Sequence, residues 1–186
     1  MQEDAEAQCR LAFCYYHGEG VEKDESKARE LFTAAAQQGH DVAQYEVGLR
    51  YYEGDGVEQD YGIALVWLEK SAAQGNVRAQ FLLGECYHNG YGVERDYSAA
   101  FEWYQKAADQ YDEIAELALG ECYEKGHGVA RDVEKAVEYY AKAGGFGSEC
   151  IVAAEERLEA LVKSGVKTAK VALKEVKKNR KKYEKI

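Results

Sequence analysis

Ser164, Gly165, Val166 and Lys167 form the one S-x-x-K sequence in the chain. In penicillin-interacting enzymes this spacing places a nucleophilic serine beside a lysine for acyl transfer. S-D-N and K-T-G, which supply the other proton-transfer groups of that chemistry, do not occur in the sequence. A serine followed by glycine is also typical of a helix terminus. We therefore interpret the motif as a helix end and expect no catalytic residue here.

The remaining reactive side chains do not have the spacing of a metal or cofactor site. The four histidines do not form H-E-x-x-H, and the G-x-G segments lack the Lys-Ser/Thr that completes a phosphate-binding loop. The cysteines are odd in number without any C-x-x-C, which argues against zinc and against a disulfide framework. We expect reduced, small buried thiols, no metal and no cofactor. The cysteines are Cys9, Cys14, Cys86, Cys122 and Cys150.

The charge of the chain is unevenly distributed. Residues 1 to 162 hold 14 Lys/Arg against 32 Asp/Glu, whereas residues 163 to 186 hold 10 against 2. The net charge of −10 therefore divides into an acidic body of −18 and a basic tail of +8. Because an acidic body repels phosphates, binding of nucleic acid or an anionic membrane would have to use the tail.

The elements that carry these residues follow from an internal repeat. The chain matches itself at a period of 36 residues, in four units that start near Ala7, Ala43, Ala79 and Ala115. Each unit contains a tyrosine, a G-x-G-V segment, an aspartate and an alanine at fixed offsets. The segments are GEGV from Gly18, GDGV from Gly54, GYGV from Gly90 and GHGV from Gly126, and the aspartates are Asp24, Asp60, Asp96 and Asp132.

Each unit reads as two antiparallel helices. Apolar and small residues recur at helical spacing on both sides of the glycine segment, and the chain contains no proline. The glycines end the first helix and the aspartate caps the second. Asp4, Asn76, Asp112 and Ser148 are suited to cap the first helices, with His40 as the exception in that column. The sequence therefore predicts an all-α fold.

The shared pattern has a family resemblance. Residues 79 to 108 carry its fullest form, A-x-x-x-L-G-x-x-Y-x-x-G-x-G-V-x-x-D-x-x-x-A-x-x-W/Y-x-x-K-A-A. This order resembles the Sel-1-like repeat, a relative of the tetratricopeptide repeat, over residues 7 to about 145. It departs locally at Ala12, which replaces a helix glycine, at Gln110-Tyr111, which replaces the usual Q-G, and at Gly144-Gly145.

The resemblance implies a right-handed α/α superhelical solenoid that serves as an adaptor or scaffold without chemistry of its own. We expect four repeats over residues 1–147, a degraded fifth first-helix over 148–165, and a basic amphipathic C-terminal helix or tail over 166–186. A cysteine-rich branch of the family is linked to penicillin-binding chemistry, which makes a hydrolase the remote alternative. In that branch, disulfide bonds between cysteines eight residues apart link the helices, and this spacing is absent here.

In the tetratricopeptide relatives, first-helix positions spaced i, i+3, i+7 and i+10 build the inner wall. Transferred to this chain, the spacing implies a partner-binding groove on the concave face, aromatic at one end and acidic at the other. For Tyr45 and Phe81 the alternative is packing between neighbouring repeats. The expected groove residues are Phe13, Tyr16, Tyr45, Leu49, Tyr52, Phe81, Glu85, His88, Glu121 and Glu124.

We therefore expect a non-catalytic scaffold that binds a peptide or helix with an apolar anchor and basic residues, and no small-molecule substrate. The alternative is electrostatic binding of nucleic acid or an anionic membrane through residues 166–186. The chain as given lacks the order of a signal peptide, so a cytoplasmic location is expected, with secretion of a longer precursor as the open alternative.

Overall fold

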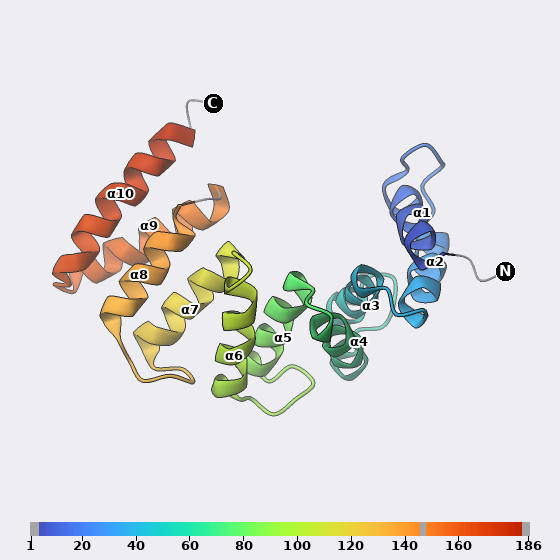
Figure 1. Ribbon diagram of the computed structural model, residues 1–186, viewed down its shortest axis with the longest axis horizontal. Coiled ribbons are helices and arrows are strands. Elements are labelled where there is room, and N and C mark those ends of the chain that lie inside the picture. The colour runs from blue at the N-terminus through green and yellow to red at the C-terminus, as the bar shows by residue number, and fades with distance from the viewer. Residues whose placement is uncertain (1–3, 146–147, 184–186) are drawn as a thin grey trace. The chain divides into compact units, whose positions relative to one another are not determined.

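The computed structural model describes residues 4–145 and 148–183, and this described part consists of ten α-helices without a strand. The predicted all-α fold is confirmed. The chain divides into two compact units, which we call unit 1 (Met1–Arg95) and unit 2 (Asp96–Ile186). Unit 1 holds α1 (Ala5–His17), α2 (Glu25–Gln37), α3 (Asp41–Glu53), α4 (Tyr61–Ala73) and α5 (Val77–Asn89) (Figure 1). Unit 2 holds α6 (Tyr97–Ala108), α7 (Glu113–Lys125), α8 (Val133–Ala143), α9 (Ser148–Lys163) and α10 (Lys167–Tyr183).

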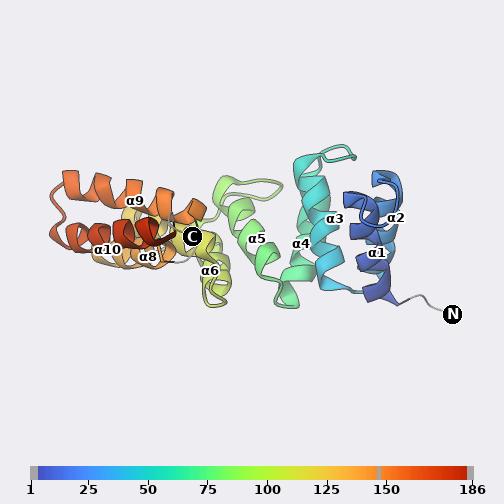
Figure 2. The ribbon, with the colours of Figure 1, turned by 90° about the horizontal axis from the view of Figure 1, so that it is seen from above.

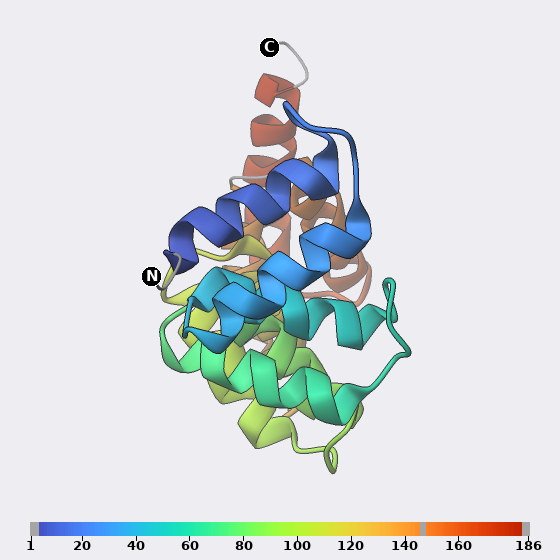
Figure 3. The same ribbon diagram turned by 90° about the vertical axis from the view of Figure 1, so that its right-hand side faces the viewer.

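Helix hairpins are the building blocks of both units. In unit 1, α1 packs on α2 and α3 packs on α4, while α2 also contacts α3 and α4 contacts α5. Figure 3 shows α1 and α2 side by side in opposite directions. In unit 2, α7 packs on α8 in the same way. The helices α2, α3 and α4 thus each contact two neighbouring helices, one in their own repeat and one in the adjacent repeat.

Side-chain caps fix where the helices begin. Oδ1 of Asp60 accepts a hydrogen bond of 2.9 Å from the N–H of Ile63, and Asp24, Asp96 and Asp132 act in the same way. The expectation that His40 breaks the column of first-helix caps is wrong. Nδ1 of His40 accepts a hydrogen bond of 3.3 Å from the N–H of Ala43. An imidazole nitrogen without a proton is an acceptor like a carboxylate, so His40 caps α3.

Two glycines mark places where backbone and side chains come close. A Cβ atom added to Gly120 in α7 would lie 2.5 Å from Cε1 of Tyr140 in α8, so the missing side chain allows the two helices to approach closely. Gly92, in the loop after α5, has a φ of 70°, and an added Cβ would lie 2.7 Å from the carbonyl carbon of Tyr61. The loop of one repeat therefore lies directly on the start of the second helix of the preceding repeat.

The end of unit 2 is covered by α9 and α10, which lie side by side and both contact α8 (Figure 2). Along α9, the side chains of Ile151, Ala154, Leu158 and Leu161 are buried, and that of Val162 is half-buried. In α10, Ala169 and Val176 are buried, and Leu173 is half-buried against the same core. The side chains of Ser148 and Tyr183 lie outside the described part. Residues 167–183 are thus a packed helix.

Candidate functional site

The expected groove residues lie on the first helices of the repeats, and all ten are half-buried. Eight of them belong to α1, α3 and α5 of unit 1: Phe13, Tyr16, Tyr45, Leu49, Tyr52, Phe81, Glu85 and His88. Glu121 and Glu124 belong to α7 of unit 2. Half-burial leaves part of each side chain in contact with solvent while the rest is held by neighbours.

Tyr52 is the centre of an aromatic cluster in unit 1. Its ring lies edge-on to Tyr61 at 5.4 Å and to Tyr91 at 5.9 Å between centroids, and Tyr61 and Tyr91 stack at 4.9 Å. Tyr91 belongs to the GYGV loop and remains 36% exposed. Sequence reasoning treated that loop as a turn and missed this residue. The signal was the variable residue between the two glycines, which carries an aromatic ring here.

The same contact recurs in unit 2, where the loop residue is His127. Its ring stacks on Tyr97, at the start of α6, with centroids 4.2 Å apart. Tyr97 and His127 lie one repeat after Tyr61 and Tyr91. In these two repeats, the residue between the two glycines therefore stacks on the first residue of the preceding second helix.

Phe13 and Tyr16 are engaged in packing within unit 1. Phe13 lies edge-on to the buried Phe32 at 4.9 Å. The hydroxyl of Tyr16 donates a hydrogen bond of 3.4 Å to Oδ2 of Asp55, in the GDGV loop. These contacts make Phe13 a helix-packing residue of the first repeat and Tyr16 a link to the second.

Burial acts on two phenols of this surface. It raises the pKa of Tyr52, with the neighbouring Cys86 and Glu85 adding to the effect, and it also raises the pKa of Tyr45. Both side chains are therefore uncharged hydrogen-bond donors over the whole physiological range. The surface offers aromatic area and hydroxyl groups to a partner.

A buried ion pair that the sequence did not indicate lies behind this surface. Nη1 of Arg50 is 2.9 Å from Oε2 of Glu46, one helical turn earlier in α3, and the two side chains are 7% and 12% exposed. The Arg50 guanidinium lies over the rings of Phe32 and Tyr16. Its charge is thus paired and stacked at the boundary between the first two repeats.

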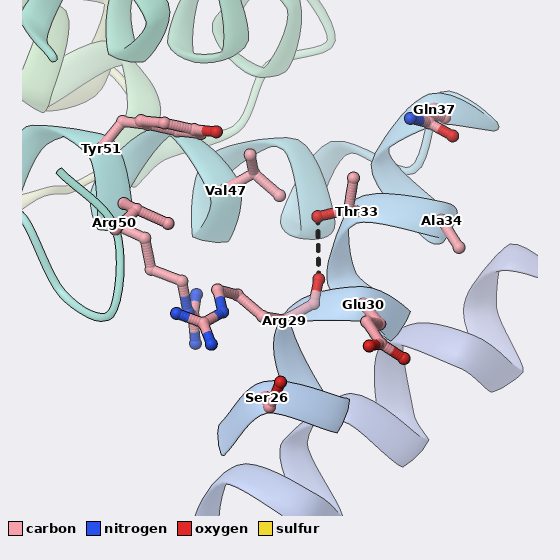
Figure 4. A pocket seen from close by; sticks show the side chains of 10 residues that line it. Ser26, Arg29, Glu30, Thr33, Ala34, Gln37, Val47, Arg50 and Tyr51 are labelled. Atoms are coloured by element: carbon pink, nitrogen blue, oxygen red, sulfur yellow. Dashed lines mark hydrogen bonds between the residues drawn. The ribbon is translucent and has the colours of Figure 1, made fainter. Parts of the chain in front are cut away.

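A pocket of about 490 Å³ lies between α2 and α3 of unit 1 (Figure 4). Arg29 and Glu30 of α2 and Arg50 of α3 supply its charges. A guanidinium N–H of Arg29 donates to the carbonyl of Gly56, and the hydroxyl of Thr33 donates to the carbonyl of Arg29 at 2.8 Å. These groups hold the helices and loop together, and the lining contains no nucleophile paired with a base.

The acidic residues of α7 already have partners in unit 2. Oε1 of Glu121 accepts a hydrogen bond from Nη2 of Arg157, and Oε2 lies 2.8 Å from Nζ of Lys125. The buried hydroxyl of Tyr140 donates a hydrogen bond of 2.6 Å to Oε2 of Glu124. We had expected Glu121 and Glu124 to receive a partner's basic residues, and the structure shows both carboxylates engaged within the chain. Arg157 lies one repeat after Glu121, a spacing that could have revealed the pair.

The S-x-x-K residues form a helix terminus, as interpreted from the sequence. The hydroxyl of Ser164 donates a hydrogen bond of 2.8 Å to the carbonyl of Leu161 at the end of α9. Gly165 follows with a φ of 94°, and Lys167 is the first residue of α10. The serine hydroxyl thus satisfies a helix-end carbonyl.

The thiols were expected to be small buried side chains. Cys86 and Cys122 are buried, which confirms their expected place in the core, whereas Cys14 in the same column is half-buried. That column faces the preceding repeat, and α1 meets no earlier repeat in the described part. Over residues 4–145 and 148–183, His, Cys, Asp and Glu side chains form no group of three that could hold a metal ion. In the same residues, every helix is too short or too polar to cross a membrane.

This chain is similar to known proteins in both sequence and structure. The Sel1 repeat family model matches residues 5–40, 41–76, 77–112 and 114–144. A Sel1 repeat protein from Oxalobacter formigenes is 31% identical with a TM-score of 0.79, over 96% of this chain and 74% of that protein. The protective antigen c5321 of uropathogenic Escherichia coli, which displays an SLR fold, is 36% identical with a TM-score of 0.77 over 84% of this chain. This chain covers 34% of that antigen, about a third of its length.

A third solved structure is cysteine rich protein B of Helicobacter pylori, at 26% identity and a TM-score of 0.52, over 71% of this chain and 95% of that protein. The comparison with curated proteins gave no match. Sel1 repeat proteins are generally scaffolds for protein–protein interaction and generally non-catalytic. Because the Sel1 repeat model matches four repeats of this chain and the Oxalobacter Sel1 repeat protein is similar over most of its length, this chain belongs to the Sel1 repeat family.

Proposed function

We propose that this chain binds another protein through the first-helix surface of unit 1. We use the name aromatic wall for five side chains of this region. Four lie on α3 and α5, namely Tyr45, Leu49, Tyr52 and Phe81, and the fifth is Tyr91 in the loop after α5. The observation that carries the proposal is the cluster of Tyr52, Tyr61 and Tyr91, three rings in mutual contact of which Tyr91 keeps 36% of its surface exposed.

Clustered tyrosines suit a binding surface for two physical reasons. Each ring offers a large apolar area together with a hydroxyl group, so it anchors both apolar and polar groups of a partner. The contacts with Tyr61 and Tyr91 already restrict the rotamers of Tyr52, so less side-chain entropy is lost on binding. The wall is therefore partly preorganised before a partner arrives.

The partner we propose is an extended or helical segment with an apolar anchor and a basic residue. The anchor would contact Tyr52 and Tyr91. The basic residue would approach Glu85, a half-buried carboxylate of α5 whose charge acts on the phenol of Tyr52. We do not extend the basic contacts to Glu121 and Glu124, because Arg157, Lys125 and Tyr140 already occupy those carboxylates.

Affinity capture with matched tyrosine variants tests this proposal. The full chain is immobilised and exposed to a lysate of its native organism, and bound proteins are quantified by mass spectrometry. Tyr52→Ala and Tyr91→Ala should lose a protein that the wild type retains. The control is Tyr111→Ala, because Tyr111 lies in unit 2, outside the wall, and is 84% exposed. If all four baits retain the same proteins in equal amounts, the aromatic wall is not the binding surface.

A further inference from the structure

The exposed face of α10 carries lysines along its whole length. Five of them are spaced three or four residues apart, so they lie on one face of the helix, and all five are exposed. At 1.5 Å per residue this row is about 21 Å long. We call it the lysine stripe, and it consists of Lys167, Lys170, Lys174, Lys178 and Lys181.

The opposite face of α10 fixes the stripe on unit 2. Ala169 and Val176 are buried in a core that also contains Tyr140 and Leu158. Figure 1 shows α10 lying along α9 and α8. The lysines are therefore presented by a packed helix, and a partner would meet them in a fixed register.

Among the described residues, most lysines of the stripe have no ion-pair partner. Lys178 lies 3.0 Å from Glu175, and both side chains are mainly exposed. Within the described residues, the other four lysines of the stripe have no carboxylate within ion-pair distance. A hollow of about 1180 Å³ lies along α10, and its lining includes Lys170, Lys174 and the apolar side chain of Leu173.

One flank of α10 already binds an acidic helix. Glu155 and Glu159, four residues apart in α9, face Lys177 and Arg180, three residues apart in α10. Nζ of Lys177 is 2.7 Å from Oε1 of Glu159, and Nη1 of Arg180 is 3.2 Å from Oε2 of Glu155. The stripe repeats this three- and four-residue spacing on the exposed face of α10.

We propose that the lysine stripe docks an acidic amphipathic helix of a partner protein. Carboxylates spaced i, i+4 on that helix would face Lys170, Lys174 and Lys178, and an apolar residue beside them would contact Leu173. The charge complementarity is the one that α9 shows on the neighbouring flank. This surface lies in unit 2 and uses no residue of the aromatic wall, so the proposal is independent of the proposed function.

An acidic protein helix fits this face better than nucleic acid or a membrane does. A phosphate backbone offers nothing apolar to Leu173, whereas an amphipathic helix does. The buried apolar residues of α10 are Ala169 and Val176, and they lie in the core of unit 2, so they are not available for insertion into lipid.

The test uses the full chain and a designed probe. The probe is a fluorescent peptide of about 20 residues that favours a helix, with Glu at i, i+4 and Leu beside them, and its control is a scrambled peptide of the same composition. Binding is followed by fluorescence anisotropy. The variant K170Q/K174Q/K178Q should bind the probe about tenfold more weakly. The matched control K70Q/K106Q/K142Q removes the same charge from α4, α6 and α8 and should bind like the wild type.

Several outcomes would overturn the proposal. They are an absence of probe binding, equal binding of the scrambled peptide, or an equal loss in both triple variants. A duplex of about 20 base pairs or a phosphatidylserine vesicle that binds more tightly than the probe at the same salt would overturn it as well. Circular dichroism melts establish that both triple variants fold. Tyr52→Ala should leave probe binding unchanged. A failure of the lysine-stripe proposal can therefore be distinguished from a failure of the aromatic-wall proposal.

Discussion

The guanidinium of Arg50 lies 4.5 Å from the centre of the Phe32 ring, across the boundary between the first two repeats. Arg50 also pairs with Glu46, so a buried cation, a buried anion and an aromatic face meet at one place. In the next repeat the corresponding positions hold Leu82 and Cys86, both buried. The boundary between the first two repeats thus contains a buried ion pair, whereas the equivalent positions of the third repeat hold uncharged side chains.

We expect Arg50→Ala to lower the free energy of unfolding by about 3–5 kcal/mol, because Glu46 would remain buried without its partner. The double variant Glu46→Leu/Arg50→Cys reproduces the next repeat and should cost less than Arg50→Ala alone. Urea denaturation of the single and double variants measures both values. A double variant as unstable as Arg50→Ala would show that the ion pair itself stabilises the boundary.

Tyr111 offers a stabilising substitution. It has a φ of 66° and is 84% exposed, whereas Gly39 and Gly75 hold the same place in the two preceding repeats. A left-handed conformation is costly for a residue with a Cβ atom and nearly free for glycine. Tyr111→Gly should therefore raise the free energy of unfolding by about 0.5–1 kcal/mol, and Tyr111→Asn by less. A lower melting temperature for Tyr111→Gly would refute this account of the turn.

Glu121 should make the stability of unit 2 dependent on acid pH. Burial opposes its ionisation, but the hydrogen bond from Lys125 and the charge of Arg157 outweigh burial and hold the pKa of Glu121 below its usual value. In the unfolded chain the pKa of a glutamate is about 4.3. Because the pKa of Glu121 is lower in the folded state, its ionised carboxylate stabilises the fold fully at pH values above about 4.3. This stabilisation is lost as the pH falls through the folded-state pKa.

Glu121→Gln should accordingly be less stable than the wild type by about 1 kcal/mol at pH 7, and the difference should shrink between about pH 5 and pH 3. Urea titrations at a series of pH values measure it. A difference that stays constant over this range would mean that the charge of Glu121 does not contribute.

The thiols should differ in reactivity according to burial. Burial raises the pKa of Cys86 to about 12 and that of Cys9 to about 11, so both remain protonated at neutral pH. Iodoacetamide at about pH 8 should modify the half-buried Cys14 first and reach Cys86 only after unfolding. Intact mass spectrometry followed by peptide mapping measures the order. Prompt modification of Cys86, or a melting temperature that depends on reductant, would contradict the expected reduced core thiols.

The sequence was sufficient for features that each repeat carries within itself. The capping aspartates, the glycine that admits Tyr140, and the burial of Cys86 all follow from local spacing at a period of 36 residues. His40 was misjudged because the propensity scale for caps omits a neutral imidazole, which accepts through Nδ1 as a carboxylate does.

Contacts between repeats were harder to predict. The cluster of Tyr52, Tyr61 and Tyr91 joins a first helix, a second helix and the loop of the following repeat. No single helical face contains all three residues, so helical periodicity could not bring them together. Glu121 was read as an open acidic position because its partner Arg157 lies beyond the fourth repeat, where the pattern is degraded.

Measuring the affinity of the captured partner for wild type and Tyr52→Ala tests the central claim most directly. Isothermal titration calorimetry with the purified partner gives both dissociation constants, and thermal melts establish that the variant is folded. The aromatic wall predicts a loss of about 1–3 kcal/mol for Tyr52→Ala and no change for Tyr111→Ala. Equal dissociation constants for wild type and Tyr52→Ala would contradict binding at the aromatic wall.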